Sequence, residues 1–94
     1  AEKAHSLLTA ADSGSFYKVW FVPNQAKDNA EEMLRASESL LALKLEENPS
    51  DVRTLMRIRA VNQALTRLKG NINYGLICDK LARDFIIGET VWQR

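Results

Sequence analysis

The chain has 94 residues, 46% apolar and 27% charged, and its 13 basic and 12 acidic side chains leave a net charge of +1. This length fits a single domain spanning 1–94, and the near-neutral balance selects neither nucleic acid nor a membrane as a partner. One cysteine and one histidine exclude a disulfide framework and a metal site built from several such side chains. No apolar run approaches the roughly 20 residues that span a bilayer. We therefore expect an intracellular, cytoplasmic protein without metal or cofactor.

The N-terminal part predicts a short helix over residues 2–11, in which Leu7 and Leu8 are the large apolar anchors. After a turn, the segment 16–22 is rich in aromatic and β-branched residues and ends at Pro23. Local propensity favours a strand there. A lone strand leaves its backbone groups unpaired, however, so the segment either pairs with another chain or is helical.

The next two segments predict an antiparallel helical hairpin, with helices over about 24–47 and 49–69. Apolar residues recur at helical spacing in both segments. Between them we expect Asn48 to be the N-cap of the second helix and Pro49 its first residue, with Asp51 near the positive helix end. The second helix stops at Gly70. Its expected apolar stripe consists of Val52, Leu55, Ile58, Val61, Leu65 and Leu68.

A third helix is predicted over about 72–87, with Gly88 suited to end it. The predicted fold class is therefore all-α: the hairpin, a third helix laid across it, the short N-terminal helix, and a segment 16–22 of open conformation. The side chains expected in the core are Leu40, Leu41, Ile58, Val61, Leu65 and Leu81.

Catalytic residues are not apparent. His5 has no cysteine or carboxylate at a spacing typical of nucleophilic catalysis. Cys78 lies on the predicted apolar face of the third helix, where a thiol acts as a small hydrophobic side chain. The four glycines form no phosphate-binding pattern. We therefore expect that the protein is not an enzyme.

Charge is divided unevenly between the two long helices. Residues 24–50 carry 3 basic and 6 acidic side chains, whereas residues 51–69 carry 5 basic and 1 acidic. At about 100° per residue, three arginines and two alanines of the second helix lie on one face. The small alanine side chains would let another helix or a nucleic-acid duplex approach this face closely. We call this row the arginine stripe: Arg53, Arg57, Ala60, Ala64 and Arg67, with Lys69 near its end.

The arginine stripe admits three interpretations. It is a solvated face paired with the neighbouring acidic helix, a docking site for an acidic protein, or a phosphate-binding row for double-stranded nucleic acid. Charge patterns alone do not separate these three.

The other candidate site is aromatic. Four of the chain's seven aromatic residues lie within the six positions 16–21: Phe16, Tyr17, Trp20 and Phe21. Such residues either close the core or form a contact for self-association, since aromatic side chains concentrate at interface centres.

The sequence thus predicts a protein-interaction module, such as an adaptor, a regulator or a small subunit of an assembly, whose partner is another protein and which forms homodimers. The alternative is a nucleic-acid binder without sequence specificity that uses Arg53, Arg57, Arg67 and Lys69.

Overall fold

The computed structural model describes residues 2–70 and 73–92. Within these ranges the protein is helical and contains no strand, which confirms the all-α class. The elements in chain order are α1 (Glu2–Asp12), α2 (Phe16–Gln25), a single 3-10 turn η1 (Lys27–Asn29), α3 (Ala30–Glu47), α4 (Val52–Lys69) and α5 (Tyr74–Trp92).

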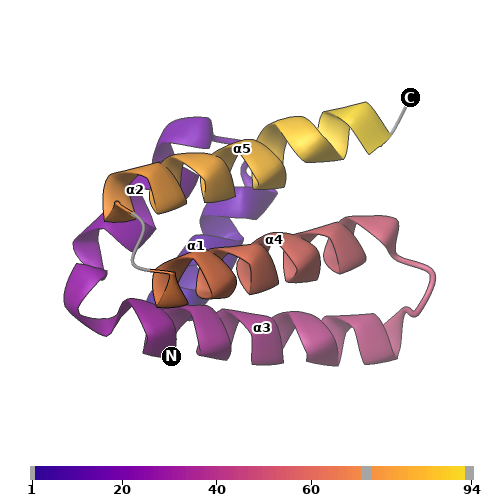
Figure 1. Ribbon diagram of the computed structural model, residues 1–94. Helices are drawn as coiled ribbons and strands as arrows, with labels where there is room; N and C mark the ends of the chain where they lie inside the picture. The colour runs from indigo at the N-terminus through magenta and orange to yellow at the C-terminus, as the bar shows by residue number, and fades with distance from the viewer. Residues whose placement is uncertain (1, 71–72, 93–94) are drawn as a thin grey trace.

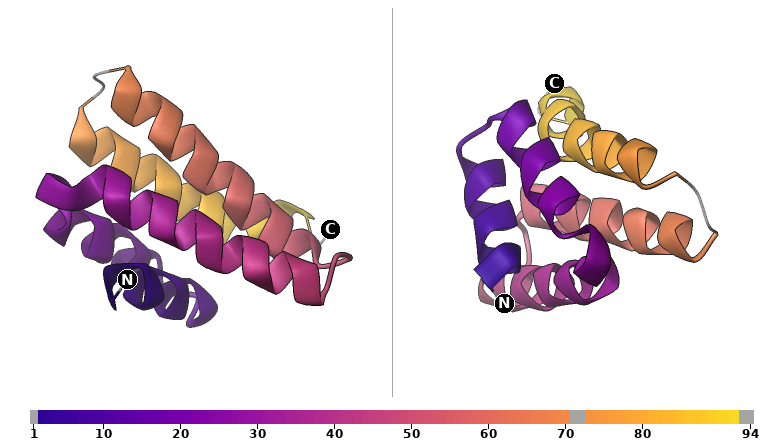
Figure 2. Two further views of the ribbon diagram at one scale, coloured as in Figure 1. Left: turned by 90° about the horizontal axis from the view of Figure 1, so that it is seen from below. Right: turned by 90° about the vertical axis from the view of Figure 1, so that its left-hand side faces the viewer.

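Helices α3, α4 and α5 lie side by side and alternate in direction (Figure 1). Helices α1 and α2 pack on one side of these three, as the right-hand view of Figure 2 shows. There α1 contacts α2 and α3, while α2 contacts α1 and α5. One buried apolar cluster, centred on fully buried side chains such as Phe85, Leu41 and Leu7, receives residues from all five α-helices.

The segment 16–22, for which the sequence left strand and helix as alternatives, is helical. Gly14 has a φ of +74°, in the left-handed region that favours glycine, and turns the chain after α1. Ser15 then caps α2, because its hydroxyl oxygen accepts a hydrogen bond from the backbone N–H of Lys18 at 3.3 Å. Val19 and Pro23 are buried, so tertiary packing overrides the local β-propensity of this run.

Several predicted helix boundaries are wrong. The N-cap of α4 is Asp51 rather than Asn48, because the Asp51 carboxylate accepts hydrogen bonds from the Thr54 hydroxyl at 2.7 Å and the Thr54 N–H at 3.4 Å. The hydroxyl hydrogen bond lowers the pKa of Asp51 below its usual value. Asn48 instead ends α3, donating its N–H to the Lys44 carbonyl oxygen.

The limits of the third predicted helix also differ. Gly88 does not end it, since α5 continues to Trp92. Residue 72, its predicted start, lies outside the described residues, and α5 begins at Tyr74. Gly70 ends α4 as expected.

Candidate interaction surface

The four aromatic residues predicted for self-association lie together on α2. Tyr17 is 63% exposed, Phe16 36% and Phe21 37%, while Trp20 is half-buried against the core. We call these four side chains the aromatic surface. The rings of Tyr17 and Phe21 stack at 5.6 Å between centroids, and Tyr17 lies 6.1 Å from Trp20.

Helix geometry explains why this surface faces outward. Val19 and Pro23, one turn apart, carry α2 into the core. Tyr17 and Phe21 are also one turn apart and lie about 160–200° around the helix from Val19, so they point away from the core. A run that is apolar on every side therefore has one face that no described helix covers.

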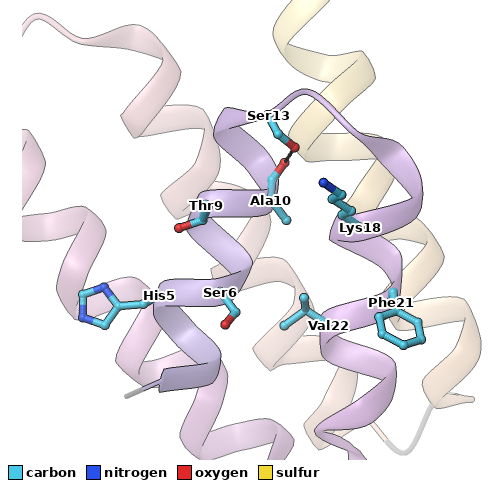
Figure 3. A pocket seen from close by; sticks show the side chains of 8 residues that line it. All are labelled: His5, Ser6, Thr9, Ala10, Ser13, Lys18, Phe21 and Val22. Carbon is cyan, nitrogen blue, oxygen red and sulfur yellow. Dashed lines mark hydrogen bonds between the residues drawn. The ribbon is translucent and has the colours of Figure 1, made fainter.

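A groove between α1 and α2 borders the aromatic surface (Figure 3) and was not foreseen from the sequence. It has a volume of about 350 Å³. Ser6 and Ser13 line its α1 side, Lys18 and Val22 line its α2 side, and His5 points away from α2. The full lining consists of His5, Ser6, Thr9, Ala10, Ser13, Lys18, Phe21 and Val22.

The groove has a sequence signal in hindsight. Ser6, Thr9 and Ser13 are spaced by three and four residues along α1, which places small polar side chains on one helical face. Small side chains leave room between two packed helices. Phe21 belongs to both the groove and the aromatic surface.

The arginine stripe does not form one exposed row, which corrects the expected placement. Arg57 is only 5% exposed and turns inward. Its Nη1 donates a hydrogen bond to Oδ1 of Asp12 at 2.7 Å, and its guanidinium carbon lies 5.9 Å from the ring centroid of Phe85. Arg57 therefore ties α4 to α1 and α5.

The alanines of the stripe are buried as well. Ala60 and Ala64 share the face of α4 that carries Arg57, and their exposures are 2% and 0%. The helices that approach α4 closely are α3 and α5 of the same chain, which lie on either side of it (Figure 1). Of the remaining stripe residues, Arg53 and Lys69 are exposed and Arg67 is half-buried.

The other candidate reactive group, Cys78, is fully buried on α5. Burial raises the pKa of its thiol, which favours the protonated form over the nucleophilic thiolate. Its neighbour Tyr74 donates a hydrogen bond from its hydroxyl to the Pro23 carbonyl oxygen at 2.6 Å, and burial raises the pKa of this phenol. The two side chains lie where α5 meets α2.

Two kinds of feature are absent from the described part of the chain. Among the side chains of residues 2–70 and 73–86, no group of three or more His, Cys, Asp or Glu could hold a metal ion. Within residues 2–70 and 73–92, no helix combines the length and apolar character needed to cross a membrane.

The aromatic surface and the groove beside it lie next to one another on α2, which makes them a candidate site for contact with another molecule. Comparison of the chain with protein-family models, with curated proteins and with solved structures gives no match.

Proposed function

We propose that this protein is a non-enzymatic interaction module, such as an adaptor, a regulator or a small subunit of an assembly, and that it self-associates through the aromatic surface of α2. The observation that carries the proposal is the exposure of Tyr17, at 63%, with its ring stacked on that of Phe21, which is 37% exposed. Transfer of aromatic rings from water into an apolar contact is favourable, so neighbouring exposed rings on a monomer gain free energy when a partner covers them.

The size of the aromatic surface supports this proposal. With about 150–250 Å² per aromatic side chain, the exposed fractions of Phe16, Tyr17 and Phe21 amount to roughly 200–340 Å². Standard interfaces bury about 800 Å² on each partner, with an apolar centre and a polar rim. The aromatic surface supplies such a centre, and polar residues of α1, such as Thr9, flank it.

The placement of Arg57 supports a protein partner over nucleic acid. A phosphate-binding row needs accessible cations at its centre, and the Arg57 guanidinium is occupied by Asp12 inside the protein. We therefore place the proposed contact surface on the aromatic residues of α2, and two-fold dimers are the commonest closed arrangement of identical chains.

Mass measurement in solution tests the proposal. By light scattering at micromolar concentration, the wild type should show twice the chain mass of 10.6 kDa. Tyr17→Ser should be monomeric under the same conditions, because it removes the most exposed ring of the aromatic surface.

Leu43→Ser is the matched control. Leu43 is 57% exposed, close to the value for Tyr17, and lies near the C-terminal end of α3. Its loss should leave the dimer intact. A wild type that stays monomeric up to 100 micromolar, or equal effects of the two substitutions, would contradict the proposal.

A further inference from the structure

We propose that the α1–α2 groove is the seat for Tyr17 of a second copy, so that the dimer consists of two reciprocal contacts around a two-fold axis beside α2. This inference rests on the self-association proposed above and adds how the two copies fit. In each contact, the ring of one copy enters the groove of the other.

The arrangement of the two features on one helix supports this fit. Phe21 and Lys18 line the groove, and Tyr17 stands next to both on α2. A projection and a depression that share one helix are self-complementary under a two-fold rotation, since each copy both offers and accepts. Contact between the two aromatic surfaces alone would leave both grooves unfilled, at about 350 Å³ each.

The chemistry of the groove suits a tyrosine. Ala10 and Val22 provide an apolar base for the ring, and the hydroxyl of Ser6 can bond with the phenol oxygen. The Ser13 hydroxyl already donates to the Ala10 carbonyl oxygen at 2.6 Å. A groove with both apolar and hydroxyl lining fits a side chain that has an apolar ring and a polar tip.

Charge favours the same occupant. Lys18 is exposed at the groove, and no arginine, aspartate or glutamate is among the residues that line it. An ammonium group attracts the negative face of an aromatic ring and repels a basic side chain. The exposed aromatic rings of a second copy supply that face.

Two variants that each destroy one half of the contact test this inference. Ser6→Trp fills the groove from an exposed position of α1, and Tyr17→Ser removes the ring. Each variant alone loses both contacts of its homodimer, so its dimer dissociation constant should rise by about thirtyfold or more, as for a buried aromatic anchor.

Mixing the two variants should restore association. The Ser6→Trp chain still offers Tyr17, and the Tyr17→Ser chain still has an open groove, so the mixed dimer regains one of the two contacts. Differently labelled chains, followed by energy transfer, should associate more tightly in the mixture than either variant does with itself. Ser13→Trp is a second groove-filling variant with the same expectation, and circular dichroism checks that each variant is folded.

Asn62→Trp, an exposed position on α4, is the matched control for adding a tryptophan and should dimerise like the wild type. If both groove-filling variants dimerise like the wild type, or if the mixture does not associate, the groove is not the seat, although self-association stands. A monomeric wild type overturns both proposals.

Discussion

Arg57 is a cation placed inside a small apolar core. A planar guanidinium can satisfy a carboxylate and lie over an aromatic ring at once, which Asp12 and Phe85 provide here. Asp12 is itself half-exposed and also lies 3.9 Å from Nζ of Lys44. One carboxylate at the end of α1 therefore contacts both α3 and α4.

Because of these contacts, Arg57→Ala should lower the free energy of unfolding by about 1–3 kcal/mol, through a lost charged hydrogen bond and lost packing, since the half-exposed Asp12 that remains is still solvated. Arg59→Ala, the same change at an exposed position two residues on, should shift it by no more than about 0.5 kcal/mol. Urea denaturation of the two variants measures the difference. Equal midpoints would show that the Asp12–Arg57 contact does not stabilise the fold.

The sequence could not reveal this role of Arg57. Its partner Asp12 is 45 residues away along the chain, and helical periodicity carries no information about which distant carboxylate a cation meets. The grouping of the four aromatic residues was predictable, by contrast, because they are neighbours in sequence, but whether they face the core or water was not.

At the scale of helices, the expected apolar stripe of α4 holds only in its second half. Val61 and Leu65 are buried, Ile58 is half-buried, but Val52 and Leu55 are 49% and 41% exposed. Two residues three positions apart on a helix are separated by about 300°, which is 60° short of a full turn. Three such steps lead from Val52 to Val61, so these two side chains point to opposite sides of α4. The first turns bury Thr54 and Arg57 instead.

This rotation gives a test on one helix. Leu65→Ala should cost about 2–5 kcal/mol of stability through lost packing and a residual cavity, because Leu65 is 8% exposed within the core. Leu55→Ala removes the same atoms from a position 41% exposed and should cost less than about 1 kcal/mol. Thermal melts of the two variants measure this contrast, and a reversed order would show that the described orientation of α4 is wrong.

Of the six predicted core residues, Leu41, Val61, Leu65 and Leu81 are buried, and Leu40 and Ile58 are half-buried. Helix existence follows from periodicity, whereas helix ends depend on competition between neighbouring caps. Asn48 and Asp51 are both good N-cap residues, and Thr54, three residues after Asp51, decides between them. Sequence reasoning alone did not weigh that hydroxyl.

At the scale of the whole molecule, the proposed dimer couples stability to concentration. If only the dimer buries the aromatic surface, each tenfold rise in protein concentration should raise the melting temperature by about 3–5 °C. Tyr17→Ser should melt at one temperature at all concentrations. Scanning calorimetry across two decades of concentration measures this, and a wild-type melting temperature that does not move would contradict dimerisation.

The hydrogen bond between Tyr74 and Pro23 has a consequence for the order in which the protein is made. It joins residues 51 positions apart and marks where α5 covers the buried face of α2. At roughly 5–20 residues per second, a ribosome adds those residues in about 3–10 s. For that interval the aromatic helix has been synthesised while its cover has not, so both of its faces are open to water and to chaperones that bind apolar segments. Newly made chains are therefore most prone to aggregate just before α5 emerges.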